Sequence, residues 1–284
     1  MRRALPALTR RWQVTALVRT IDPALRIQGV RQIRGDLDAP ASLRRLAGIA
    51  DAVLHSAPPP NEGEGDPRTR RLLATLARAR SLPRRLVYIS TSGVYGHCAG
   101  AVVPESRPCR ASTARARRRV AAESLLRAAG QRGQRVSILR APGIYASDRL
   151  PLERVRRGDP VLLADEDSYT NHIHAEDLAA ACVIALERGG TNRCYNINDD
   201  SAERMGDWFD KLADAFGLPR PPRVTRAEAQ SRLSPMLLSF MNESRRLDNT
   251  RMKRELKLRL RYPTVDAGIA AALQQGKSPC SCSG

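Results

Sequence analysis

Residues 85–96 read Arg-Leu-Val-Tyr-Ile-Ser-Thr-Ser-Gly-Val-Tyr-Gly. The continuous apolar run, ended by small polar residues and glycine, predicts a strand at 85–91 that is buried on both faces. Further runs of this kind predict strands at 14–20, 51–57, 135–140 and 194–198. Helical patterns separate the strands at 40–46, 67–79, 112–129 and 175–187. This alternation predicts an α/β fold with a Rossmann-type, doubly wound parallel sheet.

The second half of the chain has a different character. After Tyr145, prolines and arginines become frequent and strand-like runs become sparse, while Asp248–Leu258 has a charged, helical pattern. We therefore expect a Rossmann-type domain over residues 1–145 and a small mixed C-terminal substrate lobe over 146–273. Residues 175–199 are expected to return from that lobe to the sheet.

Both ends of the chain depart from a regular fold. Residues 274–284 lack apolar periodicity and predict a loose tail. Residues 2–12 predict a helix that leads directly into the strand at 14–20. A dinucleotide-binding fold normally begins with a strand and a Gly-rich turn, and that strand is central in the sheet. We therefore expect an open middle of the sheet, as in a chain that is truncated or starts too far downstream.

The chain is strongly basic. Its 284 residues include 48 lysines and arginines against 29 acidic residues, which gives a formal net charge of +19. Lysine is rare among the basic residues, and aromatic residues make up only 4% of the chain. The arginine excess therefore resembles a composition bias, and few aromatic rings are available to stack on bases. Association with nucleic acid is a remote alternative.

Neither a membrane anchor nor a metal site is predicted. No run approaches the ~18 consecutive apolar residues of a membrane helix, and Thr9 with its arginine neighbours interrupts any signal-peptide core. The six cysteines show no metal-ligand or disulfide spacing. His172 and His174 lie two residues apart without a third ligand nearby. These features favour a cytoplasmic protein without a metal.

Several segments, in the expected order, resemble the extended short-chain dehydrogenase/reductases, also called NAD-dependent epimerase/dehydratases. The similar segments are Ser90–Gly96, Pro104–Pro108, Leu139–Tyr145, Asn171–Leu178, Asn249–Leu256 and Tyr262–Thr264. The resemblance covers roughly residues 14–270. It implies a Rossmann fold, NADP or NAD as the cofactor, and a small-molecule substrate such as a nucleotide sugar or another carbonyl or hydroxyl compound. It is also compatible with a homodimer.

The resemblance also implies positions for the cofactor. Arg19 ends the predicted strand at 14–20, where NAD-preferring members carry an acidic residue, and an arginine there can pair with the 2′-phosphate of NADP. A solvated arginine is the alternative. Asp36 and Leu37 resemble the family's adenine-contacting pair, and a plain turn residue is the alternative for Asp36. His55 would line the ribose and pyrophosphate, and a core residue with satisfied hydrogen bonds is the alternative. The other implied cofactor-binding residues are Ala57, Pro58, Ser90, Arg119, Pro142, Gly143 and Ile144.

The catalytic positions depart from the family pattern. Thr91 matches the family's Ser or Thr that hydrogen-bonds the substrate carbonyl. The family's catalytic Tyr and Lys lie four residues apart, and counting back from Glu123 places Arg115 and Arg119 at those positions. Arginine stays protonated at neutral pH and is a poor general acid or base. A solvated helix face is the alternative for this arginine run.

Three tyrosines are candidates to replace the missing acid, namely Tyr95, Tyr145 and Tyr169, although each is more typical of a packing residue. The predicted function is therefore an NAD(P)-dependent epimerase, dehydratase or reductase with a non-standard active site. The alternative is a catalytically inactive NAD(P)-binding sensor or scaffold. Loss of the Tyr/Lys pair favours the sensor, whereas retention of Thr91 favours the enzyme.

Overall fold

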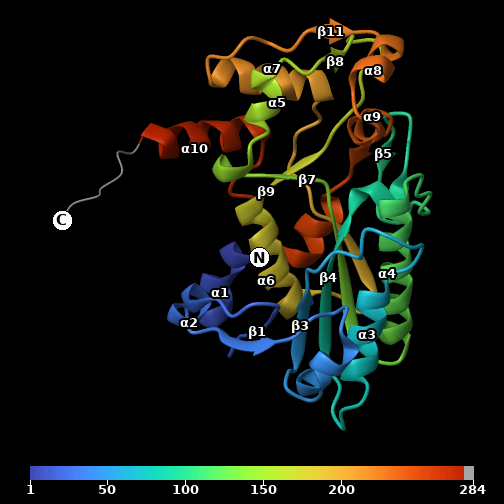
Figure 1. Ribbon diagram of the computed structural model, residues 1–284, viewed down its shortest axis with the longest axis vertical. Coiled ribbons are helices and arrows are strands. Elements are labelled where there is room, and N and C mark those ends of the chain that lie inside the picture. Colours follow the sequence, from blue (N-terminus) through green and yellow to red (C-terminus); the bar gives the residue numbers. More distant parts are fainter. Residues whose placement is uncertain (278–284) are drawn as a thin grey trace, which may run out of the picture.

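A parallel sheet forms the centre of the molecule (Figure 1). The computed structural model describes residues 1–277. Four strands pair in the order β10-β6-β4-β3, and all are parallel. They are β3 (Ala52–His55), β4 (Arg85–Thr91), β6 (Arg135–Ala141) and β10 (Arg193–Asn196). The predicted α/β fold with a parallel sheet is confirmed.

The continuous apolar runs form central strands because helices cover both faces of the sheet. In β4, Leu86 and Tyr88 pack on one face, whereas Val87 and Ile89 pack on the other. The first face is covered by η2 (Pro40–Leu46), α3 (Pro67–Leu76) and α4 (Ala114–Gln131). The second face is covered by η1 (Arg2–Ala4), α1 (Leu5–Thr9), α6 (Ala175–Arg188) and the π-helical turn η5 (Met252–Leu256).

The sheet is interrupted in its middle. A separate parallel pair consists of β1 (Thr15–Val18) and β2 (Arg31–Arg34), and within residues 1–277 no strand joins β1 to β3. Every residue of β1 and the first three residues of β3 are only half-buried, in contrast to the mostly buried β4 and β6. Within residues 1–277, each of these two strands therefore has one edge that pairs with no other strand.

A smaller lobe lies beyond the carboxyl ends of the strands (Figure 1). Its core contains Trp208, Phe209, Leu212 and Val265. Its elements are η4 (Ser147–Arg149), α5 (Leu152–Arg156), β8 (Val161–Leu162), α7 (Met205–Ala215), β11 (Arg223–Val224), α8 (Arg226–Arg232), α9 (Pro235–Met241) and α10 (Val265–Lys277). The junction contains η3 (Ser92–Tyr95), β5 (Val102–Val103), β7 (Gly143–Tyr145), β9 (His172–His174) and β12 (Arg246–Leu247). A short helix, α2 (Pro23–Ile27), links β1 to β2.

Some predicted elements have other bounds in the structure. The predicted helix at 248–258 is present over residues 250–256, with η5 as its larger part, and it ends where Lys257 adopts a left-handed conformation with φ 54°. Residues 274–277 belong to α10 and not to a loose tail, while 278–284 lie outside the described residues. The N-terminal helix ends at Thr9, before the predicted Trp12. No helix within residues 1–277 is long and apolar enough to cross a membrane.

A buried ion pair joins α4 to the sheet. Glu123 and Arg140 are 3% and 2% exposed, and Arg140 donates two hydrogen bonds to the carboxylate of Glu123, of 3.1 and 2.7 Å. Ser90 of β4 donates a third, of 2.6 Å. These bonds hold α4 over the ends of β4 and β6.

We expect Arg140→Met to lower the free energy of unfolding by about 3–5 kcal/mol, because it leaves the Glu123 carboxylate buried without its cation. Urea unfolding of the purified protein measures this change. Replacing both partners, as Glu123→Leu with Arg140→Met, should destabilise less than the single change. Arg11→Met breaks an exposed ion pair with Glu187 and is the matched control. Equal losses for Arg140→Met and Arg11→Met would contradict the prediction.

Candidate functional site

The predicted site residues of β3 and β4 gather at the carboxyl edge of the sheet. Thr91 ends β4, is half-buried, and its hydroxyl accepts a hydrogen bond from the Gly93 amide (3.3 Å). A Cβ on Gly93 would lie 3.6 Å from the Thr91 hydroxyl and 3.8 Å from the Ala116 side chain. Thr91 therefore lies beside the first turn of α4. Ser90 instead points into the protein, where its hydroxyl bonds Glu123.

His55, at the end of β3, belongs to a buried hydrogen-bonded chain. The Thr69 hydroxyl donates to Asp66 (2.6 Å) and lies 2.8 Å from Nε2 of His55. Because the hydroxyl proton is committed to Asp66, Nε2 of His55 must be the donor to Thr69. Burial, together with the charge of Arg119, lowers the pKa of His55 to about 4, against the opposing charge of Asp66. His55 is therefore a neutral histidine with a satisfied Nε2, as the core alternative proposed.

The arginine run of α4 is not a uniformly solvated face. Arg119 donates to the Ile89 carbonyl (2.7 Å) and to the Tyr88 hydroxyl (2.9 Å). Arg118 is only 8% exposed and donates to the Gly63 carbonyl (3.0 Å). Arg115 is exposed, and its guanidinium lies 4.6 Å from the centre of the Phe240 ring. The solvated-face alternative is thus wrong for Arg118 and Arg119.

A second group of predicted residues lies beyond the gap in the sheet. Arg19 follows β1 and is exposed. Asp36 accepts the amide of Asp38 (2.9 Å), which is a turn role, and the Leu37 side chain is buried. Asp38, which the sequence analysis missed, pairs with Arg68 and Arg71 of α3. These pairs connect the loop after β2 to the helix after β3, and they lower the pKa of Asp38, with Arg68 contributing most.

Ala57 and Pro58 continue from β3 into a loop, where the Pro58 carbonyl accepts a hydrogen bond from Arg68 (3.1 Å). Pro142, Gly143 and Ile144 lie where β6 passes into β7, next to β9. The structure therefore separates the predicted residues into two groups on either side of the gap and a third at the junction with the lobe.

The tyrosines are poor substitutes for a catalytic acid. Tyr95 is buried, donates its hydroxyl proton to Asn196 (2.7 Å), and packs against the Arg140 guanidinium. Tyr145 is buried and donates to the Thr264 carbonyl (3.3 Å). Burial raises the pKa of both hydroxyls well above their usual range. Tyr169 lies between the guanidiniums of Arg204 and Arg246, so all three have packing contacts.

His172 and His174 also pack against aromatic rings. The His172 ring lies 4.4 Å from Trp208, and the His174 ring lies 3.8 Å from Tyr262. Burial lowers the pKa of His172 to about 3. Among residues 1–277, no group of three His, Cys, Asp or Glu residues is arranged to hold a metal ion.

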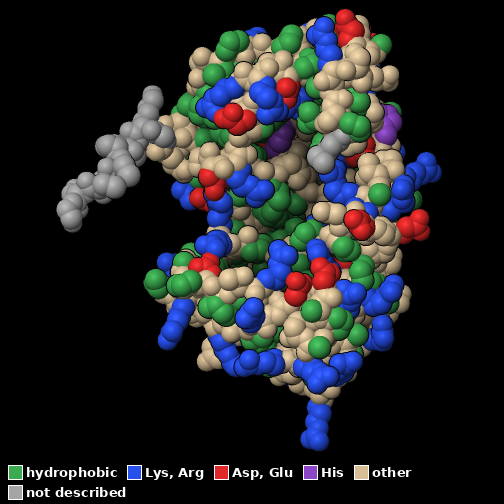
Figure 2. Space-filling model, in the orientation of Figure 1, with side chains coloured by type: hydrophobic (Ala, Val, Ile, Leu, Met, Phe, Trp, Pro, Cys, Tyr) green, Lys and Arg blue, Asp and Glu red, His purple; other side chains and the backbone are tan. Residues whose placement is uncertain are grey.

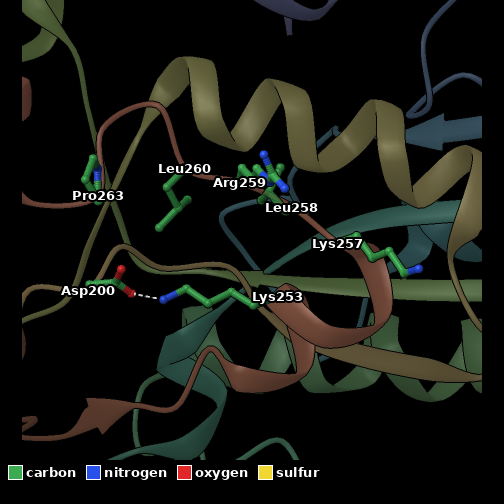
Figure 3. Close-up of a pocket in the computed structure, with 7 residues that line it drawn as sticks. All are labelled: Asp200, Lys253, Lys257, Leu258, Arg259, Leu260 and Pro263. Carbon is green, nitrogen blue, oxygen red and sulfur yellow. Dashed lines mark hydrogen bonds and ion pairs between the residues drawn. The ribbon is translucent and has the colours of Figure 1, made fainter.

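Surface pockets lie on both sides of α6. One, of about 430 Å³, is lined by Leu258, Leu260 and Pro263 with charged residues at its rim. Figure 3 shows Lys253 in it directed toward Asp200, with which it forms an ion pair. A second pocket, of about 440 Å³, lies between α6 and the N-terminal residues Arg3–Ala7. Neither pocket is lined by a predicted site residue. The face of the molecule drawn in Figure 2 is hollowed, and hydrophobic side chains form the floor of the hollow.

Sequence reasoning missed Tyr88, Asp66, Thr69, Arg118 and Phe240. Asp66-Pro67 at the start of α3 is an N-cap signal, with Asp66 accepting the Thr69 amide. That signal could have located the partners of His55. Phe240 gives no such signal, because it reaches Arg115 only through the packing of the lobe.

The neutral His55 predicts a pH dependence of stability. Between pH 6.5 and 4 the unfolded chain takes up a proton on His55 that the folded protein does not, so the free energy of unfolding falls as the pH falls. The contribution is at most about 3 kcal/mol. Urea unfolding at pH 4.5–7 should therefore show a shallower slope for His55→Gln than for the unmodified protein. An unchanged slope would show that His55 is already accessible to protons in the folded state.

Comparisons with known proteins agree with this architecture. The NAD dependent epimerase/dehydratase family model matches residues 3–198. A conserved protein of unknown function from Silicibacter pomeroyi is 30% identical, with 97% of this chain and 95% of that chain covered and a TM-score of 0.80. A double mutant of the dTDP-glucose 4,6-dehydratase DesIV from Streptomyces venezuelae, solved with NAD bound, has the same fold at 20% identity and a TM-score of 0.72, with 94% of this chain and 88% of that chain covered.

A third relative is the 3-diazoavenalumate denitrifying reductase from a Streptomyces species. It is 26% identical over 136 residues, which are 48% of this chain. The match spans only 44% of the length of that relative. The family model, in contrast, matches well over half of the chain, and its segments correspond to the sheet and helices described above. The chain therefore belongs to the NAD-dependent epimerase/dehydratase family.

Proposed function

We propose that the protein is an NAD(P)-dependent epimerase, dehydratase or reductase with a non-standard active site. The observation that carries the proposal is the position of Thr91, at the carboxyl end of a central parallel strand and beside the first turn of α4. Ligands of open α/β sheets bind outside the carboxyl ends of the strands. DesIV supports a nucleotide sugar as the substrate class, alongside other carbonyl or hydroxyl compounds.

The residues fit the two ends of a nicotinamide dinucleotide. Arg19 and Asp36 lie in the loops after β1 and β2, where they would hold the adenosine ribose and adenine, with Leu37 beside them. His55, Ala57 and Pro58 would line the ribose and pyrophosphate, Pro142–Ile144 the nicotinamide end, and Arg119 the nicotinamide ribose. Bound there, the coenzyme supplies hydride transfer. The described residues lack the Gly-rich turn before a helix that holds the pyrophosphate in dinucleotide-binding folds, so His55, Ala57 and Pro58 would border the pyrophosphate without that turn.

We also propose the division into a coenzyme domain at 1–145, with its first strand missing, and a substrate lobe at 146–273, with 175–199 returning to the sheet. The unpaired, half-buried edges of β1 and β3 support a further strand between them. Such a strand would pair with both edges, and the turn after it would lie at the carboxyl edge of the sheet. The pairing of β10 with β6 supports the return of 175–199.

Thr91 is proposed to hydrogen-bond a substrate carbonyl. Arg119 keeps the position of the family's lysine but already donates to Ile89 and Tyr88, so it positions the end of β4 and offers positive charge without moving a proton. Arg115 occupies the tyrosine position and cannot act as a general acid at neutral pH. The same two arginines favour the second candidate, a catalytically inactive NAD(P)-binding sensor.

The cytoplasmic location and the homodimer stay predictions.

Arg19 should favour NADPH over NADH. A charge-assisted pair with the 2′-phosphate contributes about 1.5–3 kcal/mol, so the difference in affinity should be about tenfold or more. Calorimetric titration of both coenzymes measures it, and Arg19→Ala should remove it. Arg26→Ala changes an exposed arginine of α2 and is the matched control. Equal affinity of the unmodified protein for the two coenzymes would refute the role of Arg19.

Turnover on nucleotide-sugar or carbonyl substrates should be very low, because the absent tyrosine relay is worth roughly 100- to 10,000-fold. Thr91→Ala should remove the remaining activity without abolishing coenzyme binding. Arg115→Tyr with Arg119→Lys restores the family pair on the same helix and should raise the rate on substrates whose reacting end carries no anionic group. Coenzyme oxidation or reduction, followed by absorbance, measures these rates. Brisk activity that is unaffected by Thr91→Ala would exclude the mechanism, and coenzyme binding without activity in any variant would favour the sensor.

A further inference from the structure

The helix α4 begins with an unusual concentration of arginine. Its first six residues are Ala114-Arg-Ala-Arg-Arg-Arg119, and its first turn contains no acidic residue. The N-terminus of a helix is its positive end, where basic residues are unfavourable. These arginines are unfavourable for the helix and lie at the edge of the sheet where ligands bind. Such a departure from helix preference points to a functional requirement.

The charges of these arginines are not neutralised within the protein. Among the described residues, none of the four forms an ion pair; Arg117 donates to the Ser112 carbonyl, and Arg118 and Arg119 donate to the neutral groups named above. The carboxylate of Glu123 is occupied by Arg140 and Ser90. Glu62 and Glu64 flank the Gly63 carbonyl but are exposed and make no ion pair.

Arg119 is committed to the end of β4 and Arg118 is buried, whereas Arg115 and Arg117 are exposed. Arg117 donates to the Ser112 carbonyl, while Arg115 lies over the face of the Phe240 ring and, among the described residues, makes no hydrogen bond or ion pair, so its donors are available to a ligand. Phe240 is itself 44% exposed, so both partners of this contact are open to solvent. Arg115 begins the same helical turn as Ala116, which lies next to Gly93 and Thr91.

We propose that Arg115 binds an oxyanion, a carboxylate or a phosphate, at the reacting end of the substrate. The inference rests on the proposed function, because Thr91 would hold the carbonyl adjoining that oxyanion. Phe240 packs against one face of the Arg115 guanidinium and would hold it in place. The arginine at the tyrosine position therefore selects a substrate class, such as the 2-oxo acids, instead of transferring a proton.

The experiment uses oxamate, a small carboxylate with an adjoining amide carbonyl, and inorganic phosphate as a second probe. Calorimetric titration of the full chain, with and without NADPH, gives the affinity for each probe. Arg115→Gln should weaken binding of the preferred probe about tenfold or more, and Arg115→Lys should weaken it less, because lysine keeps the charge and loses the planar fork. Arg117→Gln removes the same charge from the same helical turn and should change the affinity less than twofold.

The outcomes separate this inference from the function on which it rests. Preference for oxamate identifies a carboxylate substrate and preference for phosphate identifies a phosphorylated one, and either supports the proposal if only Arg115→Gln weakens binding. Equal weakening by Arg115→Gln and Arg117→Gln would mean a general basic surface and would overturn it, as would binding of neither probe. NADPH affinity, measured separately, tests the proposed function, and Arg115→Gln should leave that affinity unchanged.

Discussion

The buried pair of Glu123 and Arg140 sets the geometry of the carboxyl edge. It joins the middle of α4 to the end of β6, and through Ser90 it also ties in β4. In a buried environment of low dielectric such a pair is stable only if its hydrogen bonds are nearly complete. Because α4 carries Arg115, Arg118 and Arg119, the position of the whole arginine group follows from this single contact.

A second constraint is the gap between β1 and β3. A two-stranded parallel pair is not stable on its own in water, and here β1 and β2 are held against the rest by shared cores and by the pairs that Asp38 makes with Arg68 and Arg71. This bridge crosses the gap at the carboxyl edge. It also places two arginines near Arg19, so the charge around the proposed 2′-phosphate position is shared among several side chains and partly offset by Asp38.

The sequence allowed the central strands to be predicted because burial on both faces demands continuous apolar residues, as in Leu86–Ile89. It did not predict β2, because Arg31-Gln-Ile-Arg34 contains a single apolar residue, Ile33, and lies at the edge of the sheet. The helical pattern of residues 248–258 predicted the helix that the structure has over 250–256, but not the hydrogen bonds that Asn249 donates to the Asn198 and Asp199 carbonyls just before it. Such long-range contacts, like that of Phe240 with Arg115, cannot be read from local pattern.

Arg115 and Arg119 lie four residues apart on α4, at the positions where the resemblance implies an acid–base pair, and arginines there would change what the site can do. Neither arginine can release a proton, and Tyr95 and Tyr145 are buried with raised pKa values and occupied hydroxyls. His55 is neutral, with its Nε2 already bonded. The described protein groups at this edge are therefore suited to binding and orienting charged or carbonyl groups, and a reaction with a demanding proton transfer would have to draw its acid from water or from the substrate. An enzyme with this site would have to act on an activated carbonyl that needs no protein acid, whereas a sensor would only bind its ligand.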